Sequence, residues 1–226
     1  MAPITVRPTQ VDIEIADAIA DHTGPRTEQA AELITWGADE HVLCALAVGW
    51  WLYSRSGDSA SRGASNHVLM TTLVSSALPH ILKKMFDQER PDRLTVRGHW
   101  RGVPFSGKRL DAFPSGHAVH IGALASAASV LPSRQRNTLW AIGAGLVLTR
   151  IVLLAHWTSD VAAGLIFGAL SERLIRRFTG YPNSFTRRRA FKIHGPPPAI
   201  RRRIVKRDRM LGSMSINAAS GSNKGE

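Results

Sequence analysis

The sequence predicts an all-α fold, namely an integral membrane helical bundle of five or six transmembrane helices with an N-terminal surface helix segment. Five apolar stretches follow one another between residues 41 and 175. Two of them reach the roughly 17 residues that a bilayer-spanning helix needs. Small residues recur four positions apart, as close helix packing in lipid requires, at Gly122/Ser126 and Gly164/Gly168. The shorter stretches leave a soluble all-α core open as the alternative.

Two further features favour the membrane. Tryptophans stand near the ends of the apolar stretches, where interfacial aromatic side chains gather, and they are Trp50, Trp51, Trp140 and Trp157. Arg150 lies inside the fourth stretch, and a guanidinium there would be costly in lipid unless it faced a polar site. We therefore expect Arg150 to line a polar site within the bundle.

Composition divides the chain into three segments. Residues 1–37 mix apolar with acidic side chains and are broken at Gly24-Pro25, which predicts an amphipathic, helical surface segment. Residues 38–178 contain the apolar stretches and form the predicted membrane-embedded core. Residues 179–226 are predicted to be a basic, largely disordered cytoplasmic tail, because the prolines at 196–198 cannot continue a helix and arginine runs flank them.

The net charge of +12 over 226 residues would by itself suggest nucleic acid or an anionic surface as a partner. The charge is uneven, because residues 1–40 hold two basic and eight acidic side chains, whereas residues 171–226 hold fourteen basic and three acidic. We expect no nucleic acid partner. The tail is interpreted either as simply solvated or as an electrostatic contact with anionic lipid headgroups. The single Cys44 excludes an intramolecular disulfide.

One stretch, Asp111-Ala-Phe-Pro-Ser-Gly-His117, organises the rest. Its Pro114-Ser115-Gly116-His117 directly precedes an apolar run, so the sequence predicts a helix whose first turn begins there. The free N–H groups of such a turn, with the positive end of the helix dipole behind them, bind anions. A histidine in this turn could exchange protons with the anion.

Two other stretches strengthen this interpretation. Lys83 and Arg90, seven residues apart and closed by Pro91, lie upstream, and Thr149-Arg150-x5-His156-x3-Asp160 lies downstream. In order and spacing, the three stretches resemble the signature motifs of the type 2 phosphatidic acid phosphatase family, Lys-x6-Arg-Pro, Pro-Ser-Gly-His and Ser-Arg-x5-His-x3-Asp. The resemblance covers about residues 40 to 175. Thr149 stands where the family usually has serine, and the exchange keeps a hydroxyl.

The residue types themselves suggest a phosphoryl-transfer site. A transferring phosphoryl group spreads negative charge over its oxygens, and a cationic cradle with backbone N–H groups could hold it. The candidate phosphate-binding residues are Lys83, Arg90, Ser115, Gly116 and Arg150. His156 could attack phosphorus, Asp160 could orient its ring, and His117 could serve as acid and then base. The family resemblance implies these same roles, and it implies no metal or other cofactor.

The predicted function is therefore that of an integral membrane phosphatase, which hydrolyses a lipid phosphate or lipid pyrophosphate through a phosphohistidine. Phosphatidate, phosphatidylglycerol phosphate, polyprenyl pyrophosphate and lipid A phosphate all remain open as substrates. The predicted location is the inner (plasma) membrane, crossed several times. Basic residues in the short loops place the C-terminus in the cytoplasm by the positive-inside rule, so the active site would face the periplasm or exterior.

Two alternatives belong to other classes. Vanadate-dependent haloperoxidases share the phosphate cradle, but theirs is a soluble architecture, and the apolar stretches argue against it. A membrane-tethered scaffold could use the basic tail to hold acidic lipid or nucleic acid, but it would have no need for three spaced motifs.

Overall fold

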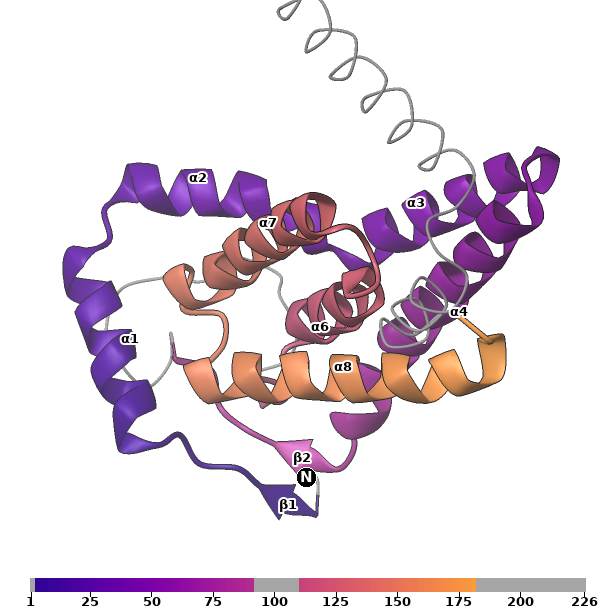
Figure 1. Cartoon of the computed structure of the whole chain (residues 1–226). Coiled ribbons are helices and arrows are strands. Elements are labelled where there is room, and N and C mark those ends of the chain that lie inside the picture. Colours follow the sequence, from indigo (N-terminus) through magenta and orange to yellow (C-terminus); the bar gives the residue numbers. More distant parts are fainter. Residues whose placement is uncertain (1–2, 92–109, 182–226) are drawn as a thin grey trace, which may run out of the picture. The chain divides into compact units, whose positions relative to one another are not determined.

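The computed structural model describes residues 3–91 and 110–181, and helices dominate these residues (Figure 1). The α-helices are α1 (Gln10–His22), α2 (Pro25–Thr35), α3 (Glu40–Tyr53), α4 (Ser59–Leu82), α6 (Gly116–Ala128), α7 (Ser133–Val152) and α8 (Thr158–Thr179). Short 3-10 turns follow α2 and α3, at Trp36–Ala38 and Ser54–Ser56. Two-residue strands β1 (Ile4–Thr5) and β2 (Phe86–Asp87) pair in parallel. The predominantly helical fold is as predicted, and the predicted tail lies outside the described residues after Tyr181.

The helix α6 lies between its neighbours α4, α7 and α8 (Figure 1). Its sequence from Gly116 to Ala128 consists largely of small residues, which lets neighbouring helices approach closely. Most of its residues from Ala118 to Ala123 are fully buried. The helix that the Pro-Ser-Gly-His motif begins is therefore the centre of the bundle.

The glycines expected to allow close helix packing are where α6 and α8 meet. A Cβ atom on Gly164 would lie 2.7 Å from the carbonyl oxygen of Ser115, and one on Gly168 would overlap the carbonyl oxygen of Val119. A Cβ atom on Gly122 would overlap the backbone of Leu165. The two backbones touch because these positions lack side chains, which confirms the close packing predicted from the glycine spacing.

At the end of the bundle away from Gly116, a buried polar cluster joins α4, α6 and α8. Glu172 is fully buried, and its carboxylate accepts hydrogen bonds from Ser126 Oγ at 2.6 Å and from Arg176 Nε at 2.8 Å. His67 Nε2 lies 2.9 Å from the same carboxylate. A buried charge is tolerated when such partners surround it, so this cluster fixes three helices relative to one another.

The N-terminal helices pack against the turn between α7 and α8. Ala16 of α1 belongs to one buried apolar cluster with Leu154 and Trp157, and Ala31 of α2 belongs to another with Leu153. The chain breaks between α1 and α2 at the expected place, with Pro25 at the first position of α2. The segment thus has an exposed face, as expected of a surface helix, and a second face that covers the α7–α8 turn.

By hydropathy, none of the helices in the described ranges is both long enough and apolar enough to be counted as a membrane span.

Candidate active site

Successive helices α3, α4, α6, α7 and α8 run in alternating directions, so their connections lie at two ends of the bundle (Figure 1). Lys83 directly follows α4, and Gly116 and His117 begin α6. Arg150 lies in the last turn of α7, and Asp160 lies in the first turn of α8. The helix directions therefore bring all three sequence motifs to one end of the bundle.

The carboxylate of Asp111 joins the two basic residues of the first motif. Its Oδ1 accepts a hydrogen bond from Arg90 Nη2 at 2.8 Å and from Nε at 3.3 Å, while its Oδ2 lies 3.4 Å from Lys83 Nζ. Arg90 Nη1 donates to the carbonyl oxygen of Ala155 at 2.9 Å. Arg90, only 5% exposed, is therefore held from two sides and stands next to His156 in the third motif.

The ring of His156 is held by a backbone carbonyl. Its Nδ1 lies 2.7 Å from the carbonyl oxygen of Ala112 and 3.8 Å from Asp160 Oδ2. The spacing of four residues would bring His156 and Asp160 to one helix face only if both were helical, but α8 begins at Thr158. The structure therefore shows Ala112 as the nearer partner of the ring.

His156 lies beyond the end of α7 and before α8, and the cations of the first and third motifs surround it. Burial lowers the pKa of this imidazole well below its ordinary value, and the positive charges of Arg90, Arg150, Lys83 and His117 lower it further. These four are candidate residues from all three motifs, and all act on the same ring. The imidazole is consequently neutral at pH 7.

Asp160 stabilises the start of α8. Its Oδ2 accepts a hydrogen bond from the N–H of Trp157 at 3.0 Å, and its carbonyl oxygen accepts one from the N–H of Ser115 at 3.3 Å. The Ser115 N–H, which the sequence suggested for phosphate binding, is thus directed at Asp160. Ser115 Oγ is buried and has no hydrogen-bond partner within the described part of the chain, so this hydroxyl is the more suitable group for an anion.

Among the described residues, the side chains of His117 and Arg150 have nitrogen atoms without a hydrogen-bond partner. Arg150, 4% exposed, donates from Nη1 to Thr35 Oγ1 at 3.2 Å, while its Nε has no partner among the described residues. No hydrogen bond to the half-buried His117 ring occurs in residues 3–91 and 110–181. Thr149, the departure from the family pattern, donates its hydroxyl to the carbonyl of Leu146 at 2.6 Å and so remains within its own helix.

Sequence reasoning missed several contributors. Asp111 and Ala112 lie just before the Pro-Ser-Gly-His motif, and Thr35 and Asp12 come from the N-terminal segment. Asp12 Oδ1 accepts a hydrogen bond from the N–H of Ser159, next to Asp160, at 2.8 Å. Asp111 begins the organising stretch and could have been suspected from its charge, but no local pattern connects Thr35 or Asp12 with α7 or α8.

The site as a whole suits an anion. Lys83, Arg90 and Arg150 supply three positive charges, balanced in part by Asp111, and ammonium and guanidinium groups are good partners for phosphate oxygens. Within the described residues, no group of three or more His, Cys, Asp or Glu side chains is arranged to hold a metal ion.

Known proteins resemble this chain in sequence over much of its length. The model of the PAP2 superfamily matches residues 64–184. A lipid A 1-phosphatase of Rhizobium etli is 30% identical over 180 residues, which cover 73% of this chain and 78% of that protein. A lipid A 1-phosphatase of Rhizobium johnstonii is 38% identical over 104 residues, and the match covers 46% of this chain and less than half, 43%, of that protein.

Two solved structures share the fold. The crystal structure of Aquifex aeolicus LpxE matches with a TM-score of 0.58 and 14% identity, over 77% of this chain and 99% of that one. A transmembrane PAP2 type phosphatidylglycerolphosphate phosphatase from Bacillus subtilis matches with a TM-score of 0.52 and 21% identity, over 77% and 87%. The family resemblance noted in the sequence is thus confirmed by the family model and by the Rhizobium etli relative, which matches most of the chain, and the protein belongs to the PAP2 superfamily.

Proposed function

We propose that this protein is a membrane-embedded phosphatase that removes a phosphate group from a lipid through a phosphohistidine at His156. The observation that carries the proposal is the convergence of three cations and two histidines at one end of the bundle. Lys83, Arg90 and Arg150 all act on the His156 ring, and His117 does so as well. A neutral imidazole beside fixed positive charges can attack a phosphate that those charges hold.

The hydrogen bond to Ala112 supports His156 as the nucleophile. A carbonyl oxygen only accepts hydrogen bonds, so Nδ1 must carry the ring proton and Nε2 must carry the lone pair. Lys83 reaches the site from the end of α4, Arg90 from the segment after β2, and Arg150 from α7. In this proposal the three cations neutralise the phosphoryl oxygens, and the hydroxyl of Ser115 and the N–H of Gly116 donate hydrogen bonds to them.

The reaction would proceed in two steps. In the first, His156 Nε2 forms a bond to phosphorus, the bond between phosphorus and the lipid oxygen breaks, and His117 donates a proton to that oxygen. In the second, His117 removes a proton from water, the water oxygen bonds to phosphorus, and the bond to His156 breaks with release of phosphate. The His117 ring, with no hydrogen-bond partner among the described residues, is suited to both transfers.

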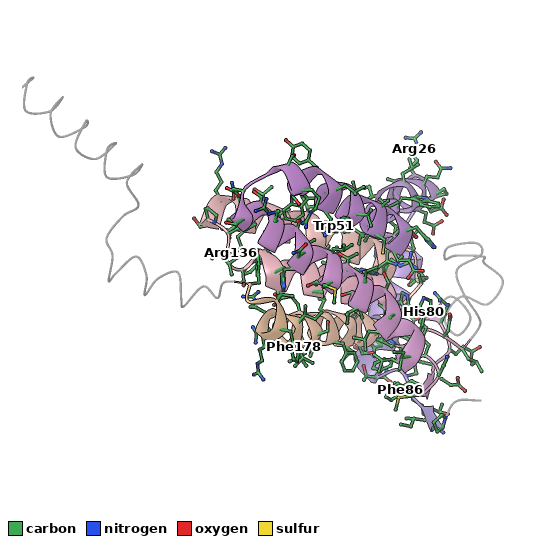
Figure 2. All side chains as sticks on the ribbon, turned by 90° about the vertical axis from the view of Figure 1, so that its right-hand side faces the viewer. Arg26, Trp51, His80, Phe86, Arg136 and Phe178 are labelled. Carbon is green, nitrogen blue, oxygen red and sulfur yellow. The ribbon has the colours of Figure 1, made fainter. Side chains whose placement is uncertain are left out.

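We propose that α3, α4, α6, α7 and α8 cross the membrane. The strongest support is an apolar row on α8 whose members stand four residues apart and are more than half exposed, namely Ile166, Leu170, Leu174 and Phe178. Phe178 lies on the outside of the bundle (Figure 2). Exposed apolar surface of this extent is rare in water, but it is what hydrocarbon chains would cover. The phosphatidylglycerolphosphate phosphatase of Bacillus subtilis, which shares the fold, is a transmembrane protein.

The orientation follows from the two ends of the bundle. Arg136 lies at one end, whereas His80 and Phe86, next to the site, lie at the other (Figure 2). Basic residues in and next to the short α3–α4 and α6–α7 connections lie at the Arg136 end and are Arg55, Arg62, Arg134 and Arg136. By the positive-inside rule that end is cytoplasmic, so we place the active site at the periplasmic face of the inner membrane.

Lipid A 1-phosphate is the substrate that we propose among the lipid phosphates left open by the sequence. The support is the activity named for the two curated relatives, one of which is matched over 78% of its length.

The test is phosphate release by the purified full-length chain from lipid A, phosphatidylglycerol phosphate, phosphatidate and a polyprenyl pyrophosphate. We expect lipid A to be the best substrate, orthovanadate to inhibit and EDTA to have no effect. Release from none of these lipids would reject the phosphatase. A preference for another lipid would reject only the choice of lipid A.

The proposed orientation has its own test in intact cells. In a Cys44→Ser background, Asp17→Cys on the exposed face of α1 should react with a membrane-impermeant thiol reagent. Ser133→Cys, at the other end of the bundle, should be protected. The reverse pattern would overturn the orientation, and labelling of both positions would argue against insertion.

A further inference from the structure

Asp111 lies outside the three sequence motifs, yet its carboxylate contacts both cations of the first one. Oδ1 pairs with Arg90 at 2.8 Å, and Oδ2 lies 3.4 Å from Lys83 Nζ. The Asp111 side chain is 21% exposed, that of Lys83 23% and that of Arg90 6%. These pairs are therefore partly shielded from water, unlike surface ion pairs, whose contribution is small.

We propose that Asp111 is a positioning residue of the phosphate site, which holds Lys83 and Arg90 in the geometry needed to receive a phosphoryl group. The inference rests on the proposed function, because Asp111 would act through two of the proposed phosphate ligands.

The contacts of Arg90 show how the positioning would work. A guanidinium has five N–H donors in one plane. Asp111 takes donors from Nε and Nη2, and the carbonyl of Ala155 takes one from Nη1. Because these anchors lie on different edges, they fix the plane of the guanidinium. A phosphate would then meet a group whose orientation is already set, which lowers the cost of binding.

Asp111 positions Lys83 in a different way, by ordering its side chain. Its ammonium ends a flexible stem, and a contact with Asp111 Oδ2 restricts that stem before substrate arrives. Ordering a long side chain opposes binding, so a side chain that is already ordered binds a ligand more tightly. The same carboxylate thus prepares two cations of different shape.

The backbone fixes the direction of the carboxylate. The N–H of Gln88 donates to the carbonyl of Leu110 at 3.0 Å, and the N–H of Ala112 donates to the carbonyl of Gln88 at 3.1 Å. Asp111 is therefore bridged to a residue two positions before Arg90, while the carbonyl of Ala112 holds His156. Residues 110–112 accordingly connect the cations with the proposed nucleophile.

The charge of Asp111 also affects the protonation of Lys83, which lies just beyond the end of α4. Burial lowers the pKa of Lys83, Asp111 raises it, and Arg90 and Arg150 lower it further. His117 and His156 face the same ammonium. Without Asp111 the ammonium would stand among cations and lose its proton at lower pH.

The test compares Asp111→Ala and Asp111→Asn with the native chain in detergent, and Asp17→Ala on the exposed face of α1 serves as the matched control. The measurements are KM and kcat for lipid A, inhibition by orthovanadate, and the alkaline limb of kcat/KM. For Asp111→Ala we expect KM and the vanadate inhibition constant to rise about 10- to 100-fold, as for a lost hydrogen bond to a charged group. The alkaline limb should also move to lower pH.

Asp111→Asn separates the charge from the hydrogen bond. Its amide oxygen still accepts from Arg90, so part of the vanadate affinity should return, while the alkaline limb should remain shifted. If Asp111→Ala does not fold, the alkaline limb of kcat/KM in Asp111→Asn still tests whether Asp111 positions the cations. Unchanged KM, vanadate inhibition and alkaline limb would overturn the inference, and so would tighter vanadate binding, since the carboxylate would then compete with phosphate.

These outcomes are distinct from a failure of the proposed function. If the native chain releases no phosphate from any lipid, the phosphatase itself is rejected. If the native chain is active and Asp111→Ala behaves like it, only the role of Asp111 is rejected.

Discussion

The Nδ1 atom of His156 lies 2.7 Å from the carbonyl oxygen of Ala112, and this hydrogen bond joins the stretch before α6 to the turn before α8. It fixes the ring with Nε2 as its unprotonated nitrogen. The carboxylate of Asp160, at 3.8 Å from Nδ1, is the more distant partner. A backbone carbonyl keeps its place when side chains are exchanged, so the orientation of His156 depends on the path of residues 110–112.

The protonation of His156 gives a first prediction. Since burial and the surrounding cations lower its pKa, the imidazole should remain neutral well below pH 6.5. Nitrogen NMR of labelled protein should therefore show a neutral His156 ring at pH 6, with the proton on Nδ1. A charged ring at that pH would contradict the account.

The same shift has a consequence for stability. Below about pH 6.5 the imidazole of His156 binds a proton in the unfolded chain but not in the folded protein. The free energy of unfolding should therefore decrease as the pH falls below that value, until the folded-state pKa is reached. In His156→Gln, whose side chain does not titrate, this part of the decrease should disappear from denaturant titrations.

Asp12 gives a prediction about the N-terminal segment. Its carboxylate caps α1 through Thr9 and also accepts the N–H of Ser159 at the start of α8. Asp12→Ala should cost about 1–2 kcal/mol of stability for the lost cap, and more if the Ser159 N–H stays unpaired. Thermal unfolding in detergent would measure this, with Asp17→Ala as the control. Equal midpoints for the two variants would refute the contact.

The stability that Asp12 provides should depend on pH. Burial raises the pKa of this carboxyl, but the hydrogen bonds from Thr9 and Ser159 outweigh that effect and leave it below its ordinary value of 3.8. A carboxyl with a lowered pKa contributes stability above the unfolded-state value and loses it as the pH falls through the folded-state one. The difference between the native chain and Asp12→Ala should therefore shrink at acidic pH, below about 3.8.

The contact between α6 and α8 predicts that alanine is harmful at Gly168 and harmless at Gly145. A Cβ on Gly168 would overlap the backbone of Val119, whereas nothing lies within 4 Å of one on Gly145 in α7. Gly168→Ala should force the helices apart at a cost of about 1–3 kcal/mol. Gly145→Ala should leave stability unchanged or raise it by up to about 1 kcal/mol. Thermal unfolding of both variants decides, and a harmless Gly168→Ala would mean that the helices are not in contact there.

The polar cluster around Glu172 should matter for stability and not for chemistry. Glu172→Ala leaves the buried Arg176 without its carboxylate, and removal of one partner of such a pair costs about 3–5 kcal/mol. Arg173→Ala, at the exposed neighbouring position, is the control. KM of the folded Glu172→Ala fraction should equal that of the native chain, because the cluster lies at the end of the bundle away from His156. A changed KM would show that the two ends are coupled.

The sequence was sufficient to predict a mainly helical fold and to predict which motifs lie at the same end of the bundle. Apolar stretches and the Gly24-Pro25 break are local signals, and the glycines at 164 and 168 marked the contact between α6 and α8. The three motifs could be brought together because alternating helices return to the same end. Each of these inferences needs only spacing along the chain.

What the sequence did not reveal depends on contacts between distant segments. Thr35 meets Arg150 only because α2 packs along α7, and Asp12 meets Ser159 only because α1 covers the α7–α8 turn. The Ser115 N–H was expected to bind phosphate, but the carbonyl of Asp160 lies close enough to accept it. Asp160 was expected to orient the His156 ring, but α8 starts two residues after that histidine, and the carbonyl of Ala112 is the nearer partner of the ring.

In the proposed mechanism His156 carries the phosphoryl group and His117 moves the protons. The most direct measurement is rapid quench of His117→Ala and His156→Ala with an aryl phosphate, followed by mass spectrometry of the histidines. His117→Ala should turn over about 10²–10⁴-fold more slowly and accumulate phosphate on His156, because its water has lost the base. His156→Ala should show neither turnover nor a phosphoenzyme. Phosphate on another residue, or turnover in His156→Ala, would contradict the account.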